Sequence, residues 1–426
     1  MLKTELLCTT ESFNNGASAC WSHGNSPLVR MGDRVFCTDS QVMPGREPFN
    51  HTTTRLFEKV GDGPWQIVYE DTDVFQREPC PVVLAGDKLL VTVNPTARTY
   101  APEEPSRVVP CTPKLYVFDV SGDVRLEKIL PMPWDPEKYN FLDHSYRGGA
   151  VDAVTGDIFF DNLHYPPDSE GEHIYALLDK EMDPVCTRDL VFPERSCYHN
   201  IAMRGGEAYV FAVQDIVEPN TEWLAYKRQV TGEMWDFDFR SIWMNYTPDI
   251  RTQGFAPAVR VCDREATCGW TDNLDCCYTA DGEMLLAVRE QNVHQRFMRD
   301  HFFPQEKLYS RLSMYRFAGG VLQETFVVDE ASEENGDAAR YTAFFHTAAD
   351  GSVYLVWDKS GGEGGLASGT YLMPLATRES RYLNAQTGFL FGSKARLGAA
   401  PDDRMDILWY TGTEIRCACL DLAEIM

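Results

Sequence analysis

Apolar residues alternate with polar ones in short runs along this chain, and seven times two such runs flank a turn built from Gly and Asp or a close variant. Alternation with a period of two predicts β-strands, and glycine and aspartate supply the positive φ that a tight hairpin turn needs. The turns lie roughly 50 to 76 residues apart, as in a repeat architecture with uneven loops. The turns with their following strands are Gly32–Phe36, Gly86–Leu90, Gly156–Phe160, Gly205–Tyr209, Asp281–Leu285, Asp350–Tyr354 and Asp402–Asp406.

Most of these hairpins are followed by a second pair of strand-like runs, such as Lys114–Phe118 with Val124–Glu127. Two hairpins make a four-stranded antiparallel blade, so the repeat predicts an all-β, seven-bladed β-propeller that spans residues 1–426 as a single domain. The last run, Glu414–Cys419, is expected to pair with Leu2–Leu7, which closes the ring and removes two exposed edges. Two stacked β domains are the alternative, but no Pro/Ser-rich linker or change of composition supports a boundary.

Long insertions interrupt the repeat at about 96–112, 216–260 and 289–310. Loops of this length in a compact domain usually carry function or lack order, and a segment as rich in tryptophan as the middle one does not fit disorder. Two interpretations of its Trp223 and Tyr226 stay open. They could pack over the neighbouring blade, or they could form a wall on which sugar rings stack at the rim of a cleft.

The composition agrees with strands and turns, with 9 Trp, 19 Tyr, 23 Phe, 31 Gly and 24 Pro, and the sequence has no helical stripe longer than about three turns. The net charge of −25 disfavours binding to nucleic acid or to an anionic membrane. The 13 cysteines form no CxxC pair, no apolar run is long enough to span a membrane, and no signal peptide is visible. We therefore expect free thiols and a cytoplasmic location, with a secreted or periplasmic location as the alternative if a leader was removed. We also expect a monomer.

The hairpin at 143–165 contains the most distinctive polar residues of the chain. His144 opens its first strand and His164 closes its second. Because a hairpin brings its two open ends together, the two imidazoles are expected within a few Å of each other, where they could transfer protons. Their neighbours in the sequence are Tyr146, Arg147 and Tyr165.

In a propeller the open ends of the first hairpins face one mouth of the ring, so the residues just outside each hairpin predict the composition of that mouth. Several of them are cations although the chain is acidic, and this contrast is the main functional signal. Three histidines of two neighbouring blades are expected to converge there: His144, His164 and His199. No nearby carboxylate or thiol completes a metal-ligand set, so no metal is assigned to them. The predicted mouth residues are Asn25, Gln41, Arg77, Glu78, Asn94, His144, His164, Tyr198, His199, Gln214, Asp275, Arg289, Glu290, Arg340, Tyr341, Asp358 and Lys359.

Three enzymatic chemistries suit a propeller with a polar mouth. A sialidase needs three arginines and a tyrosine nucleophile, but the repeated Asp-box motifs of sialidases are missing. Other glycosidases need two carboxylates across the bond, and no spacing singles out such a pair. A polysaccharide lyase needs a base, an acid and a group that binds a uronate carboxylate, which His, Tyr and Arg can supply. A propeller that only binds a glycan or a protein is the non-enzymatic alternative.

The hairpin with His144 and His164 is followed one blade later by Cys197-Tyr198-His199-Asn200. This pattern, over about residues 143–215, resembles the seven-bladed propeller lyases that cut uronic-acid glycans, such as ulvan lyases and rhamnosyl-glucuronate lyases, within the neuraminidase-like repeat group. The resemblance implies β-elimination on a uronic-acid-containing oligo- or polysaccharide. It implies that His144 or His164 acts as base or acid, and that the other binds the uronate with Arg147 or a nearby arginine. It also implies that Tyr198 or His199 is the second proton-transfer group.

The acidic net charge and the missing signal peptide differ from secreted members of these families, and they suit an enzyme that acts on imported oligosaccharides. No cofactor is required for the chemistry, although a structural divalent ion is possible. The carboxylate-binding arginine stays open among several residues: Arg77, Arg228, Arg251 and Arg289. The predicted substrate-binding residues are Arg77, Arg147, Tyr165, Trp223, Tyr226, Arg251, Arg289 and Glu290.

Overall fold

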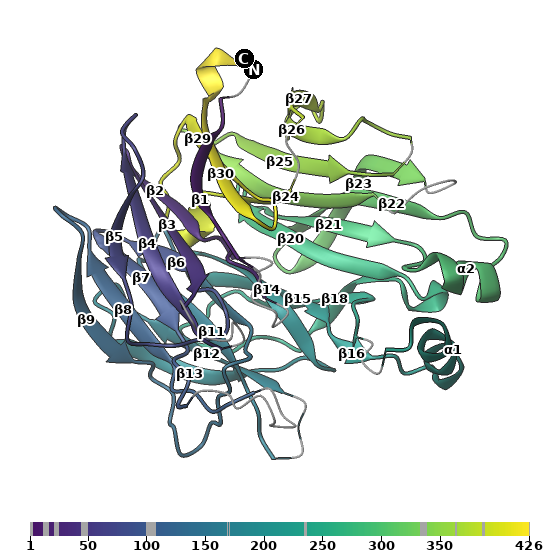
Figure 1. Ribbon diagram of the computed structural model, residues 1–426, viewed down its shortest axis with the longest axis horizontal. Helices are drawn as coiled ribbons and strands as arrows, with labels where there is room; N and C mark the ends of the chain where they lie inside the picture. Colours follow the sequence, from purple (N-terminus) through teal and green to yellow (C-terminus); the bar gives the residue numbers. More distant parts are fainter. Residues whose placement is uncertain are drawn as a thin grey trace.

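The computed structural model describes residues 3–11, 17–20, 25–43, 50–98, 108–167, 169, 171–233, 237–332, 339–362, 364–385 and 388–425. Within these residues, seven four-stranded antiparallel sheets are arranged as the blades of a ring (Figure 1), which confirms the predicted β-propeller. Residues 99–107 of the first predicted insertion lie outside the described residues, as does Leu2 of the predicted N-terminal strand.

The blades follow one another along the chain. Blade 1 contains β2 (Leu28–Met31), β3 (Arg34–Val42), β4 (Thr52–Val60) and β5 (Gln66–Glu70), and blade 2 contains β6 (Val82–Ala85), β7 (Lys88–Val93), β8 (Lys114–Asp119) and β9 (Arg125–Pro131). Blade 3 contains β10 (Arg147–Val151), β11 (Ile158–His164), β12 (Glu172–Leu178) and β13 (Pro184–Leu190). Blade 4 contains β14 (Ser196–Arg204), β15 (Glu207–Gln214), β18 (Ser241–Thr247) and β19 (Val259–Asp263).

Three further blades complete the ring. Blade 5 contains β20 (Trp270–Tyr278), β21 (Met284–Gln291), β22 (Tyr309–Ala318) and β23 (Val321–Ser332). Blade 6 contains β24 (Arg340–Thr347), β25 (Val353–Ser360), β26 (Gly369–Pro374) and β27 (Arg381–Asn384). Blade 7 combines β28 (Phe389–Gly392), β29 (Arg404–Tyr410) and β30 (Glu414–Asp421) with the N-terminal β1 (Glu5–Thr9).

The insertions add a few small elements outside the blades. They are the strand pair β16 (Ile216–Val217) and β17 (Phe237–Asp238), the helices α1 (Thr221–Thr231) and α2 (Arg296–Phe302), and 3-10 turns at Glu265–Thr267, Ala395–Leu397 and Leu422–Glu424. Neither helix in the described part of the chain has the length and apolar character needed to cross a membrane.

The two ends of the chain close the ring as predicted. Strand β1 pairs with β30, with Glu5 opposite Cys417, and the two termini lie together in Figure 1. A buried ion pair joins the first and last blades, because Nε of Arg30 on β2 donates to Oδ2 of Asp406 on β29 at 2.7 Å. Pairing the terminal strands in one blade leaves no gap in the ring at which a blade edge would be exposed.

Each interface between neighbouring blades contains its own cluster of buried apolar side chains. In β11, Phe160 packs with residues of blade 2, whereas Phe159 packs with residues of blade 4. Because successive side chains of a strand point to opposite faces, Asn162 and His164 share the face of Phe160. Asp161 therefore points the other way, toward blade 4.

Six of the seven predicted tight turns connect the first two strands of a blade, but the one at Asp402 and Asp403 does not. The strand before it is β28, and residues 393–403 form a longer connection that contacts the inner strands of several blades. Lys394 and Arg396 of this connection pair with the buried Asp275 of β20. The apolar residues of the connection resemble those of a strand in the sequence. The buried ion pairs with Asp275 hold the connection across the centre of the ring.

Candidate active site

His144 lies three residues before β10 and contacts Glu78, which lies four residues before β6 of the neighbouring blade. Nδ1 of His144 is 2.7 Å from Oε1 of Glu78. The Glu78 side chain is 3% exposed, whereas that of His144 is 27% exposed. An ionised carboxylate only accepts hydrogen bonds, so Nδ1 of a neutral imidazole carries the proton and Nε2 carries the lone pair. The contact thus presents a basic nitrogen that a buried carboxylate orients.

Arg147 holds the segment that carries Glu78. Its guanidinium donates to the carbonyl oxygens of Thr92, Glu78 and Pro79 at distances of 2.8 to 3.2 Å. The side chain is buried and connects blade 3 to blade 2. Its N–H groups are directed at backbone oxygens, so Arg147 fixes Glu78, and through it His144, from inside the protein.

Three tyrosines surround His144. The Tyr146 ring lies 5.4 Å from the His144 ring and 4.7 Å from the Tyr198 ring, and the Tyr165 hydroxyl donates to the carbonyl oxygen of His144 at 2.8 Å. Tyr198 lies in a register shift of β14, between Cys197 and Asn200, with a φ of 55°. A left-handed backbone at a residue other than glycine costs roughly 1–3 kcal/mol and is found most often at functional sites. A pocket at this point is lined by Glu78, Pro79, Pro81, Ser145, Tyr146, Arg147 and Tyr198.

A buried ion pair lies close to Tyr146. Nη1 of Arg195 is 2.9 Å from Oδ2 of Asp215, and the Arg195 guanidinium lies 5.9 Å from the centre of the Tyr146 ring. Burial raises the pKa of Asp215 above its usual range, and the charge of Arg195 opposes the shift. The Tyr146 hydroxyl is hydrogen-bonded to Asp215 and to the Tyr198 hydroxyl. Burial also raises the pKa of Tyr198 well above its usual value of 10, so its hydroxyl stays protonated at neutral pH.

Two arginines lie near this site, each paired with a carboxylate. Nε of Arg77 lies 3.3 Å from Oε1 of Glu78. Burial raises the pKa of Tyr165 to about 12, and the charges of Arg195 and Arg77 act against this shift, so both cations lie near the tyrosine. The sequence predicted Arg77 at this mouth, and the structure places it beside His144, Tyr165 and the pocket.

His164 points away from this group, toward blade 2. Its buried ring contacts Tyr139 and Phe141 edge-on, with centroid distances of 4.9 and 6.2 Å. Neither of its ring nitrogens has a hydrogen-bond partner among the residues that the structure describes. Burial lowers the pKa of His164 below its usual 6.5. The predicted contact with His144 is therefore not observed in the described part of the chain, because the two imidazoles have different neighbours.

His199 is buried between blades 3 and 4. Its Nδ1 donates to Asp161 of β11, and its ring lies 4.0 Å from that of His173 on β12. The predicted convergence of His144, His164 and His199 is thus corrected, since each imidazole occupies separate surroundings. The carboxylate beside His199 is that of Asp161, which the sequence analysis did not place there. The direction of the Asp161 side chain depends on which face of β11 packs on blade 4, and the sequence does not show this.

Two further predicted residues are engaged in ion pairs on blade 5. Nη2 of Arg289 lies 2.5 Å from Oδ2 of Asp272. Glu290 is buried and accepts hydrogen bonds from Arg264 and from the Tyr315 hydroxyl. Neither Arg289 nor Glu290 lines the pocket beside His144. Their predicted contact with substrate stays a prediction.

The remaining predicted substrate-binding residues lie elsewhere. Nε of Arg251 donates at 2.6 Å to Asp157 in the tight turn of blade 3, at the end of the hairpin opposite His144. Trp223 and Tyr226 lie on α1, which packs against α2 in Figure 1. The Tyr226 ring stacks on His301 at 4.1 Å. These contacts fit the first of the two interpretations, and contact of Trp223 and Tyr226 with substrate stays a prediction.

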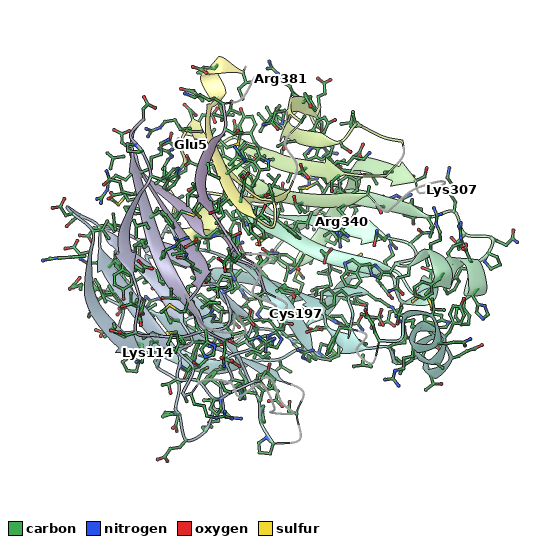
Figure 2. All side chains as sticks on the ribbon, in the orientation of Figure 1. Glu5, Lys114, Cys197, Lys307, Arg340 and Arg381 are labelled. Carbon is green, nitrogen blue, oxygen red and sulfur yellow. The ribbon has the colours of Figure 1, made fainter. Side chains whose placement is uncertain are left out.

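The sequence analysis missed the ion pair of Arg195 and Asp215. Arg195 directly precedes β14, and Asp215 directly follows β15, so both lie one residue beyond the hairpin ends (Figure 2, where Cys197 marks the start of β14). A window one residue wider would have included Asp215, whereas Arg195 lies three residues before Tyr198, the first residue predicted for this hairpin. The contacts of His173 with His199 and Asp161 needed the register of three strands, which the sequence does not provide.

No family model matches the sequence, and no curated protein matches it. Among solved structures, a PL25 ulvan lyase bound to -[GlcA(1-4)Rha3S]- has a TM-score of 0.55 and 12% identity, covering 99% of this chain and 96% of that one. A second PL25 ulvan lyase structure has a TM-score of 0.53 and 11% identity over the same shares of the chains. A mutant Trypanosoma rangeli sialidase with trans-sialidase activity reaches 0.44 at 12% identity, covering 84% and 57%. At these identities the first two structures establish the propeller fold alone, and the third supports no conclusion.

Proposed function

We propose that the protein is a carbohydrate-active enzyme that cleaves uronic-acid-containing oligo- or polysaccharides by β-elimination beside the partly exposed His144. The observation that carries the proposal is the pairing of a partly exposed imidazole with the buried Glu78. Tyr198, a tyrosine that stays protonated, lines a small pocket together with Glu78.

In the proposed reaction His144 is the base. Its Nε2 takes the proton from C5 of the uronate, next to the carboxylate, and becomes an imidazolium. Glu78 stabilises this cation through the hydrogen bond at Nδ1, which also fixes the orientation of the ring. Arg147 holds the Glu78 backbone and so positions the base, and its predicted contact with substrate stays a prediction.

Tyr198 is the proposed acid. The bond between C4 and the glycosidic oxygen breaks, the electrons of the C5–H bond form the C4=C5 double bond, and the Tyr198 hydroxyl protonates the leaving oxygen. Tyr146, which is hydrogen-bonded to Tyr198 and Asp215, can return a proton to Tyr198 after the reaction. The Tyr198 hydroxyl is protonated at neutral pH, so it holds the proton that the leaving oxygen needs, and the charge that develops on that oxygen in the transition state favours the transfer.

Arg77 and Arg195 are the proposed carboxylate-binding cations. Abstraction of the C5 proton places negative charge on the uronate carboxylate, and a guanidinium close by lowers the energy of that state. Both arginines lie near Tyr165, which contacts the His144 backbone. The glycan bound to the PL25 ulvan lyase contains glucuronate, and that supports a uronate as the substrate class for this chain.

A panel of uronate glycans tests the proposal, with wild type, His144→Ala and Tyr198→Phe as the enzymes. We expect wild type to produce near-ultraviolet absorbance from unsaturated uronate on at least one glycan. The two variants should lose about 100-fold or more of that rate, within the range that general acid–base groups contribute. Tyr382→Phe, at an exposed site on β27, is the matched control and should retain the wild-type rate. Equal rates for wild type, His144→Ala and Tyr198→Phe would refute the assignment of both groups.

A further inference from the structure

The interface between blades 3 and 4 contains two imidazoles and a carboxylate that face one another: Asp161 on β11, His173 on β12 and His199 on β14. Their side chains are between 0 and 3% exposed. One nitrogen or oxygen atom of each lies within 4.8 Å of the others. We call these three residues the His–His–Asp cluster.

The hydrogen bonds of His173 fix which nitrogen carries its proton. Its Nε2 lies 2.7 Å from the carbonyl oxygen of Ser196, which only accepts, so Nε2 carries the hydrogen. In a neutral ring the lone pair is then on Nδ1, which lies 3.7 Å from Oδ2 of Asp161. Within the described residues this Nδ1 has no hydrogen-bond partner. Two electron-pair donors thus face each other across a distance too long for a hydrogen bond, and a cation between them would satisfy both.

The charge of Asp161 gives an independent argument. The carboxylate is buried, and no lysine or arginine of the described residues forms an ion pair with it. Its Oδ1, like Nε2 of His199, also lacks a hydrogen-bond partner in the described part of the chain. Buried charges in proteins are normally paired or bound to a metal. Imidazoles alone surround this one, and neutral imidazole is a common metal ligand.

A second buried acidic group shows the contrast. Glu218 and Asp238, near Cys268, also come close enough together to hold a metal ion. There, however, Lys227 and Arg240 form ion pairs with both carboxylates. Two side-chain cations already neutralise the two carboxylates, so that group needs no metal, whereas no lysine or arginine of the described residues pairs with Asp161.

We propose that Asp161, His173 and His199 bind a divalent first-row transition-metal ion of the zinc type. Two imidazoles and one carboxylate are a ligand set that such ions prefer, and one candidate ligand atom of each residue lies within 4.8 Å of the others. The carbonyl oxygen of Ser196 orients His173 in the way that outer hydrogen bonds orient metal ligands.

One residue of the cluster borders a cavity. His173 lines a cavity of about 330 Å³, whose walls include Glu194, Arg195 and Ser196, and a water from it can supply a fourth ligand. Because His199 directly follows Tyr198, the bound ion would hold the register shift of β14 from which Tyr198 projects. This inference concerns metal binding and does not depend on the proposed reaction.

Metal content measured by mass spectrometry tests the proposal on the full chain after loading with zinc and removal of loosely bound metal. We expect about one zinc per wild-type chain, and at least a fivefold loss in Asp161→Asn and in His173→Gln. His346→Gln is the matched control. His346 is buried and its Nε2 also donates to a backbone carbonyl at 2.7 Å, but it has no place in the cluster, so this variant should retain its zinc.

Two further measurements separate the cluster from the 13 cysteines as the source of bound metal. Cobalt loaded into wild type should show the visible bands of tetrahedral nitrogen and oxygen ligation, without the thiolate charge-transfer band of a cysteine site. Zinc at one hundred times its dissociation constant should raise the melting temperature of wild type by about 3 °C and leave that of His173→Gln unchanged. Absence of zinc from loaded wild type, or full retention by both cluster variants, would overturn the proposal.

Discussion

Replacing His164 with leucine should stabilise the fold. The wild-type imidazole is buried against Tyr139 and Phe141, and its two nitrogens lack hydrogen-bond partners in the described residues. A polar group that loses water without gaining a partner costs about 1–3 kcal/mol. Leucine has a similar volume and no polar atom, so it removes this cost while it keeps the contacts with the two aromatic rings.

The size of the effect follows from the length of the chain. An unfolding entropy of about 2.1 cal/mol/K per residue gives roughly 0.9 kcal/mol/K for this protein, so a gain of about 1–3 kcal/mol raises the melting temperature by about 1–3 °C. The gain should grow as the pH falls. Burial lowers the pKa of His164 in the folded state, so below pH 6.5 the unfolded chain binds a proton that the folded chain excludes, and only wild type loses stability in this way.

Urea denaturation at pH 7 and pH 5.5 measures both effects. His346→Leu is the matched control, because this buried histidine donates to the Asp402 carbonyl, and its loss should destabilise the fold. A loss of more than about 1 kcal/mol in His164→Leu would show that the imidazole has a partner and would refute the reasoning. The same variant tests the predicted catalytic role of His164, since a stabilised protein that no longer cleaves glycans would assign that role to it.

Three other variants probe the site and the fold. Glu78→Gln should lower turnover about 10- to 100-fold by weakening the charge-assisted hydrogen bond to His144, as measured by steady-state kinetics. Asp406→Ala should destabilise the fold by about 3–5 kcal/mol in urea denaturation, because it leaves Arg30 buried without its partner. Asp358→Asn should stabilise the fold by roughly 2–4 kcal/mol at pH 7 but little at pH 4. Burial raises the pKa of Asp358 from 3.8 to about 8 in the folded state. As the pH rises from 3.8 toward 8, the wild-type carboxyl ionises in the unfolded chain but stays protonated in the folded chain, so the free energy of unfolding of wild type falls.

Each of these variants has a clear contrary result. Unchanged turnover in Glu78→Gln would remove the carboxylate from the proposed mechanism. A loss below about 1 kcal/mol in Asp406→Ala would mean that strand pairing alone closes the ring. A stability difference between Asp358→Asn and wild type that does not change from pH 4 to pH 7 would show that the Asp358 carboxyl is ionised in the fold.

The blade pattern could be predicted from the sequence because it depends on local features. Alternating residues and the turns at Gly86 and Gly156 set strand pairing within a few residues, and these hairpins are present as expected. The connection at 393–403 could not be predicted in this way. Its path depends on the pairing of Lys394 and Arg396 with Asp275, which is more than a hundred residues away in the sequence.

The site was predicted only in part because a hairpin end fixes where a residue lies but not which way it points. His144 and Tyr198 were both expected at one mouth, and their rings both contact Tyr146 there. His164 and Asp161 differ by three positions and so face different blades, which follows only from the packing of β11 against its two neighbours.

The products of wild-type digestion test the proposed β-elimination most directly. Proton NMR of a cleaved uronate glycan should show one vinylic H4 signal of an unsaturated uronate for each new reducing end. New reducing ends without that signal would identify a hydrolase. Binding of every glycan on the panel without any cleavage would identify a binding protein, and either result would contradict the account.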